Sequence, residues 1–148
     1  MGFLSASVRG LVVATAVAAA AGCATSAQEP KQVKAVYHLT NGLDEAQRAM
    51  GNVRNHLNAD PKAKIVVVGN GNGIEFMLDG AKDRNGNPFD ATIQDLKSKG
   101  VDFRLCNNTL VTRKIDKSKV IPEVTIVESG VAEAASLQFR EGFAYLRP

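Results

Sequence analysis

The chain has 148 residues, a formal net charge of +3 at pH 7 and no tryptophan. A charge this small, with no run of five like charges, argues against a nucleic acid as the partner. Once the first 30 residues are set aside, the length is that of one ordinary domain with a single core.

Residues 1–30 differ in kind from the rest of the chain. Arg9 is followed by the uncharged apolar run LVVATAVAAAA and then by small residues, which is the pattern of a secretory signal peptide. The run is shorter than the roughly 20 residues that a membrane-spanning helix needs. We therefore expect residues 1–30 to be an export signal with a short linker, residues 31–148 to be one domain, and the protein to be periplasmic or otherwise exported.

The signal can be processed in two ways, and the sequence leaves both open. Residues 20–23 read AAGC, which resembles a bacterial lipoprotein signal, in which Cys23 would be lipidated and become the first mature residue; Ala20 stands where leucine is usual. Cleavage after residue 26 or 27 would instead give a soluble periplasmic protein. The mass of the mature N-terminus distinguishes the two, and a membrane is an expected partner only if Cys23 carries a lipid anchor.

Residues 31–148 alternate between strand and helix patterns. Residues 33–39 are rich in β-formers and predict a strand. Apolar residues then recur at steps of three and four across residues 43–57, which places them on one face of a helix that ends before Pro61. Residues 64–68 are a continuous apolar run, which is typical of a strand buried on both faces.

The segment 69–73 reads GNGNG and follows that strand directly. It matches neither G-x-G-x-x-G nor a phosphate loop ending in Gly-Lys-Ser/Thr, so we interpret it as a tight turn that needs positive φ angles and leads into a short helix at 74–78. A weak anion site at the start of that helix stays an alternative. A second amphipathic helix is expected across residues 89–96, closed by Gly100.

The last third of the chain predicts three more strands with helices between them. The strands are expected at 101–105, 124–127 and 143–146, and the helices at 107–111 and 131–140. Asn107 or Asn108 is expected to cap the first of these helices and Ser129 the second. The predicted fold is therefore α/β: a single-domain parallel sheet of about five strands with helices on both faces.

In such a sheet the carboxyl ends of the strands share one edge, where ligands bind. The polar residues expected at or near this edge are His38, Asn41, Asn70, Cys106, Asn107, Asn108, Thr109 and Ser129. Cys106 is the only thiol of residues 31–148, and a cysteine between a strand end and a helix start points its sulfur toward N–H groups that stabilise the thiolate. A reactive thiol and a buried structural thiol are the two interpretations that this position allows. No C-x-x-C or H-E-x-x-H is present, so we expect neither a bound metal nor a cofactor.

Several segments, in order along the chain, resemble the DsrE/DsrF-like family. The most specific are Cys-Asn-Asn-Thr-Leu at 106–110 and Leu-Gln-Phe-Arg-Glu-Gly at 137–142, and the resemblance covers nearly all of residues 33–148. It implies a YchN-like, flavodoxin-resembling fold that assembles into dimers, trimers or hexamers. In characterised relatives, a cysteine at the end of the third strand accepts sulfane sulfur as a persulfide and passes it to a partner thiol, and Cys106 occupies the matching place.

The resemblance makes Cys106 the candidate catalytic thiol of an exported sulfur carrier, with a sulfur donor and an acceptor protein as partners. The other polar residues of the edge, from His38 to Thr109, would shape its pocket. Characterised sulfur-relay members are cytoplasmic, whereas this chain carries an export signal. The competing hypothesis is a non-catalytic module that binds a small ligand or a protein at the same edge while Cys106 stays passive.

Overall fold

The computed structural model describes residues 1, 2 and 31–148, so the predicted signal at residues 3–30, with Cys23, lies outside the described residues. The strands are β1 (Lys34–Leu39), β2 (Lys64–Gly69), β3 (Asp102–Cys106), β4 (Thr125–Val127) and β5 (Ala144–Leu146). The helices are α1 (Gly42–Ala59), α2 (Phe89–Ser98), α3 (Asn107–Arg113) and α4 (Gly130–Glu141), with two 3₁₀ turns, η1 (Gly71–Met77) and η2 (Lys117–Lys119).

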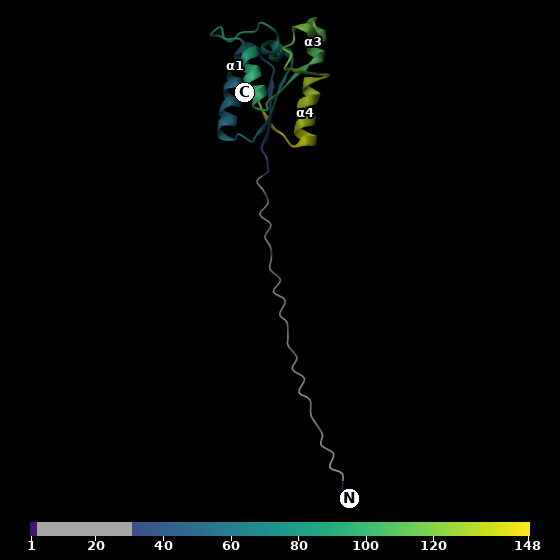
Figure 1. Ribbon diagram of the computed structural model, residues 1–148. Helices are drawn as coiled ribbons and strands as arrows, with labels where there is room; N and C mark the ends of the chain where they lie inside the picture. The colour runs from purple at the N-terminus through teal and green to yellow at the C-terminus, as the bar shows by residue number, and fades with distance from the viewer. Residues whose placement is uncertain (3–30) are drawn as a thin grey trace.

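The five strands form one parallel sheet in the order β4-β3-β2-β1-β5, which confirms the predicted fold class. The chain moves in one direction from β1 to β4 and then crosses the whole sheet to place β5 beside β1. Right-handed crossovers in opposite directions put their helices on opposite faces. Accordingly α4, which makes the long crossing, packs over β1, β2 and β3 on the side of the sheet opposite α1 (Figure 1).

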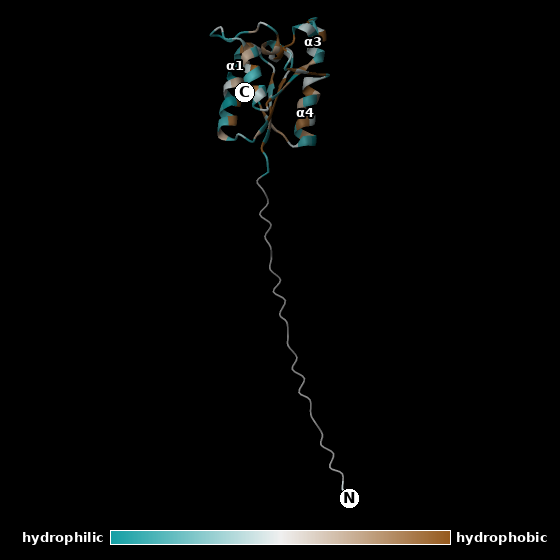
Figure 2. Cartoon of the chain, viewed as in Figure 1, coloured by the Kyte–Doolittle hydropathy of each residue, from teal (hydrophilic) through white to brown (hydrophobic). Residues whose placement is uncertain are grey.

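The two faces of the sheet carry cores of different size. On the α1 side, alternate strand residues such as Ala35, Tyr37 and Leu39 join a large cluster with α1, η1 and α2. On the α4 side, the cluster consists of Val36, Val66, Val68, Leu137 and Phe143. In Figure 2 the strands between the layers are mostly brown, whereas the outer side of α1 is largely teal. Among the described residues, the helical member of this second cluster is Leu137 of α4.

The glycine segment after β2 differs in part from the prediction. The turn η1 begins at Gly71 and is a 3₁₀ helix through Met77, so it starts earlier than the expected helix at 74–78. Of the three glycines only Gly71 has a positive φ angle, of 57°. Gly73 is needed for a different reason, because two backbone segments lie close together there. A Cβ on Gly73 would lie 2.1 Å from the Leu39 carbonyl oxygen at the end of β1.

The start of α3 also corrects the sequence prediction. Cys106, the last residue of β3, is itself the residue that precedes the helix, and Asn107 is the first helical residue. The strand runs directly into the helix, so neither Asn107 nor Asn108 occupies the capping position. The expected cap of α4 is confirmed: the Ser129 hydroxyl accepts a hydrogen bond from the Ala132 N–H at 3.4 Å.

Across residues 31–148, none of the helices is both long enough and apolar enough to pass through a bilayer.

Replacing Gly73 with alanine should destabilise the fold by about 1–3 kcal/mol, the usual cost of overpacking, because the new methyl group collides with backbone rather than with a movable side chain. Gly51→Ala is the matched control. Gly51 lies inside α1 with no atom within 4 Å of its added Cβ, so alanine should stabilise the fold by about 0.5–1 kcal/mol. Urea denaturation of both variants measures the difference, and equal stabilities would contradict the close-approach argument.

Candidate functional site

The candidate site lies in the crevice between the carboxyl ends of the neighbouring strands β3 and β4. The chain leaves β3 through α3, whose Leu110 packs into the large core, and leaves β4 toward α4 on the other face. A crevice opens where adjacent parallel strands send their connections to opposite faces, and ligands of open α/β sheets bind there. Cys106 pairs with Val127 in the register of the two strands, which puts its thiol at the crevice.

Backbone and hydroxyl donors surround the sulfur of Cys106. Burial raises the pKa of this thiol, but the Gly130 N–H, the Thr109 hydroxyl and the N–H groups of Thr109 and Asn108 outweigh burial and hold the pKa below its ordinary value. The Asn108 N–H is shared, because it also donates to the Glu128 carbonyl at 3.2 Å. The Thr109 hydroxyl oxygen accepts from the Gly71 N–H at 3.0 Å, which leaves the hydroxyl hydrogen free for the sulfur. The thiolate is thus favoured although Cys106 is only 5% exposed.

Gly130 allows α4 to start against the sulfur. A Cβ on Gly130 would lie 3.1 Å from the Cβ atoms of both Asn70 and Cys106 and 3.2 Å from the Gly69 carbonyl oxygen. Contacts this short are tighter than most real side chains tolerate, so only glycine seats the first turn of α4 there without a shift. The sequence analysis noted Ser129 as a cap but missed Gly130 as a donor. The available signal was a glycine directly after a capping serine.

The thiol faces a hollow of about 360 Å³. Its walls come from the segment after β2, the end of β3, α3 and the start of α4. The lining residues are Asn70, Gly71, Cys106, Asn108, Thr109, Thr112, Arg113, Ser129 and Val131. The structure therefore brings together four of the predicted site residues, namely Asn70, Cys106, Asn108 and Thr109.

Three other predicted residues lie elsewhere. Asn41 precedes α1, where its N–H and side-chain amide donate to the buried carboxylate of Glu45, and it lines a separate hollow at the start of that helix. Asn107 does not line the Cys106 hollow, and its side-chain oxygen is buried without a hydrogen-bond partner among the described residues. His38 does not line the Cys106 hollow but contacts Asn70, which does. The distance from His38 Nε2 to Asn70 Oδ1 is 2.7 Å.

One cationic side chain, Arg113, belongs to the wall of the hollow. Its guanidinium pairs with Glu75 at 3.1 Å and donates to the Gly71 carbonyl at 3.4 Å, so its charge is partly balanced. Arg104 points to the α4 side of the sheet instead, where it bonds Asp102 and Glu133. The main electrostatic support of the thiolate is therefore the set of N–H and O–H dipoles, not a neighbouring full charge.

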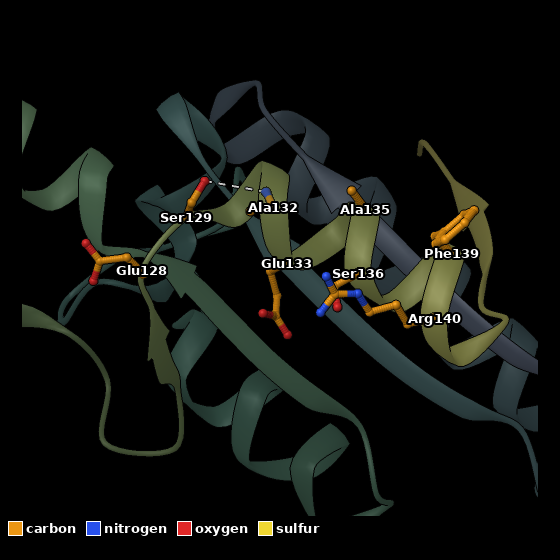
Figure 3. A pocket seen from close by; sticks show the side chains of 8 residues that line it. All are labelled: Glu128, Ser129, Ala132, Glu133, Ala135, Ser136, Phe139 and Arg140. Carbon is orange, nitrogen blue, oxygen red and sulfur yellow. Dashed lines mark hydrogen bonds between the residues drawn. The ribbon is translucent and has the colours of Figure 1, made fainter.

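A larger hollow of about 640 Å³ runs along the outer side of α4. Its lining residues are Glu128, Ser129, Ala132, Glu133, Ala135, Ser136, Phe139 and Arg140 (Figure 3). Ser129 lines both this hollow and that of Cys106, so the two surfaces meet at the start of α4. Phe139 is 91% exposed, which is unusual for a large aromatic side chain.

Metal ligation finds no support in the part of the chain that the structure describes. No three His, Cys, Asp or Glu side chains of residues 31–148 lie close enough together to hold a metal ion.

Comparison with known proteins identifies both family and fold. The sequence matches the DsrE/DsrF-like family over residues 10–148. The fold is similar to that of MTH1491, a protein of unknown function from Methanobacterium thermoautotrophicum, with a TM-score of 0.70 and 26% identity over 79% of this chain and 100% of that one. It is also similar to the ychN protein from E. coli, with a TM-score of 0.62 and 16% identity over 80% of this chain and 99% of that one. No curated protein matches the chain.

Replacing Thr109 with valine should raise the pKa of Cys106, because the variant keeps the branched shape but loses the hydroxyl that donates to the sulfur. The rate of iodoacetamide alkylation against pH reports this pKa, and the wild-type midpoint should lie below the reference value of roughly 8.5. The measurement uses the chain carrying Cys23→Ser, in which Cys106 is the only thiol. Thr112→Val is the matched control, since Thr112 lines the hollow without bonding the sulfur. A midpoint that moves equally in both variants would contradict the assignment.

Proposed function

The chain belongs to the DsrE/DsrF-like family, which is associated with sulfur relay, and from this premise we propose that it is an exported sulfur carrier whose Cys106 holds sulfane sulfur as a persulfide. One observation supports this assignment above all others. The pKa of Cys106 is held below its ordinary value, against the effect of burial, by the Gly130 N–H, by the Thr109 hydroxyl and N–H and by the Asn108 N–H. A cysteine that served only to fill the core would have no use for such donors.

Loading the carrier requires one exchange between sulfur atoms. The Cys106 thiolate attacks the terminal sulfur of a persulfide or polysulfide donor, R–S–SH. A new S–S bond forms to Cys106, the donor's S–S bond breaks, and the electron pair of that bond leaves on R–S⁻. The proton stays on the transferred sulfur, which gives Cys106–S–SH.

Unloading is the same exchange with the roles reversed. A thiolate of the acceptor attacks the terminal sulfur, and Cys106 leaves as the thiolate. The donors from Gly130, Thr109 and Asn108 favour this step because they stabilise the departing anion. The same groups therefore serve the attack, in which the thiolate must be present at neutral pH, and the release, in which it must be a good leaving group.

The competing function is a binding module in which Cys106 takes no covalent part. The hollow of about 360 Å³ is large enough for a small ligand, and its wall of asparagine, threonine and arginine side chains suits a polar one. The lowered pKa of Cys106 favours sulfur carriage over this alternative, because non-covalent binding does not require a thiolate.

Export and self-association complete the proposal. The signal pattern of residues 1–30 supports a periplasmic location, either soluble or anchored through a lipid on Cys23. We also propose that copies of the chain associate through α4. Phe139 and Val131 of this helix are 91% and 57% exposed, and the larger hollow lies beside them. Apolar exposure of this kind is typical of a contact surface.

Exposure to inorganic polysulfide should add one sulfur atom, about 32 Da, to Cys106 in the Cys23→Ser chain, because the activated thiolate attacks sulfane sulfur. Intact-mass and peptide-mass spectrometry measure the adduct, and a reductant should remove it. Cys106→Ala in the same background is the control and should gain no mass. A Cys106 thiol that alkylates slowly and gains no sulfur would leave the binding module as the better account.

Replacing Phe139 with glutamate should lower the mass of the protein in solution toward that of a single chain, because a charge would be placed in the apolar contact. Light scattering after size-exclusion chromatography measures this mass. Gln138→Glu is the control, since Gln138 is an exposed neighbour on the same helix and outside the lining of the hollow. An unchanged assembly in Phe139→Glu, or a monomeric wild type, would contradict a contact through α4.

A further inference from the structure

His38 is a buried polar side chain on the apolar α4 side of the sheet. It is 6% exposed, and the neighbouring residues on that face are Val36, Val66 and Val68. Both ring nitrogens are nevertheless bonded: Nδ1 contacts the Tyr145 hydroxyl at 2.8 Å, and Nε2 contacts Asn70 Oδ1 at 2.7 Å. Burying an imidazole among valines costs free energy that a leucine would avoid. Packing alone therefore does not explain a histidine at this position.

Tyr145, His38 and Asn70 form a chain of hydrogen bonds in which each donor can be identified. The Asn70 carbonyl oxygen can only accept, so His38 Nε2 carries the hydrogen and donates it. In the neutral ring Nδ1 is then an acceptor, and the Tyr145 hydroxyl donates to it. The Tyr145 hydroxyl completes the bonding of this tautomer, and the hydrogen on His38 Nε2 holds the Asn70 oxygen, rather than the amide nitrogen, toward the ring. The amide nitrogen of Asn70 donates to no other described residue and is not among the buried unpaired atoms.

Asn70 also borders the sulfur site. It lines the same hollow as Cys106, and the Cβ atoms of both residues lie 3.1 Å from the point where a Cβ on Gly130 would be. The donors from Gly130, Thr109 and Asn108 are directed at Cys106 Sγ itself, and the Asn70 amide is not one of them. A second sulfur would lie one S–S bond, about 2.05 Å, beyond Sγ.

We propose that His38 is a positioning residue that, held by Tyr145, turns the Asn70 amide N–H₂ toward the hollow, where it donates to the terminal sulfur of the Cys106 persulfide anion that forms when Cys106–S–SH loses its proton to water. This inference rests on the proposed function of Cys106. An unfixed asparagine could equally present its carbonyl oxygen, which would repel the anion. The hydrogen bond from His38 keeps that oxygen turned away, so His38 acts on the persulfide without touching it.

The reduced thiol and the persulfide are stabilised by different donors. Variants can therefore separate the two effects. Variants of His38 and Tyr145, whose side chains do not line the hollow, should leave the reduced thiol unchanged, because its donors are elsewhere. They should weaken only the persulfide. A variant that merely loosened the fold would change the alkylation of the thiol as well.

The experiment equilibrates the full chain carrying Cys23→Ser with inorganic polysulfide and measures the persulfide fraction of Cys106 by mass spectrometry, alongside the alkylation rate of the reduced thiol. Asn70→Ala and His38→Leu should lower the ratio of persulfide to thiol at least about tenfold, the factor expected for losing a hydrogen bond to a charged group. His38→Gln, which keeps an N–H donor and an acceptor, should restore part of it. The alkylation rate should stay within about twofold of wild type in the His38 and Tyr145 variants, whose side chains do not line the hollow.

His56→Leu is the matched control, because His56 makes a similar bond, from Nδ1 to the Tyr37 hydroxyl at 3.0 Å, on the other side of the sheet. Should leucine at position 38 prevent folding, Tyr145→Phe keeps the test open. Tyr145 is 42% exposed, and its loss should lower the ratio while Tyr37→Phe does not.

A wild-type persulfide whose level is unchanged in Asn70→Ala and Tyr145→Phe would overturn this inference and leave the proposed function standing. Equal losses in the His38 and His56 variants would overturn it as well. A wild type that forms no persulfide would overturn both.

Discussion

The contact between the first residue of α4 and the end of β3 is the constraint on which the site depends. Gly130 sits against Asn70, Cys106 and the carbonyl of Gly69, with no room for a side chain. This closeness directs its N–H to the sulfur. It also fixes where α4 begins, and α4 packs over β1, β2 and β3 on the second face of the sheet. A single glycine therefore links the chemistry of the thiol to the packing of the domain.

The long crossing of α4 has consequences at both ends of the helix. At its start, the reversal of direction opens the crevice between β3 and β4. Farther along, Glu133 bonds Arg104 of β3, and Leu137 packs on the valines of β1 and β2, which hold the helix over the sheet. Because no second helix lies beside it in the described part of the chain, its outer side stays open, with Phe139 uncovered (Figure 3).

Two opposing effects act on the thiol. Burial penalises the anion, whereas each hydrogen bond to a charged group contributes about 1.5–3 kcal/mol. At Cys106, which is 5% exposed, the donors together outweigh burial, and the pKa falls. The donating residues, Asn108, Thr109 and Gly130, lie in the first turns of α3 and α4, where N–H groups lack partners within the helix. The carboxyl edge of the sheet concentrates such ends, which is why the thiol is activated there without a nearby free charge.

Local patterns of residues were enough to predict the class of fold, the order of the elements and the place of the thiol. Hydrophobic periodicity is local, so residues 64–68 and the helix face across 43–57 could be identified from spacing alone. The position of Cys106 at a strand end followed from the same pattern, as did the cap at Ser129. The predicted start of α3 was wrong, because the strand continues directly into the helix and leaves no separate residue between them to act as a cap.

Only the tertiary structure decided which of the polar residues near the strand ends meet. Asn41 and Asn70 both follow strands, yet Asn41 turns to Glu45 at the start of α1, whereas Asn70 faces Cys106. Tyr145 carried no signal of its role, and Gly130 carried only its place after a capping serine, since both act through neighbours that are distant in sequence: Gly130 through Cys106, and Tyr145 through His38 on the adjacent strand. The order of the strands and the face on which each crossover packs determine which of these residues lie in contact. They follow from how the whole chain packs, which no local pattern of residues encodes.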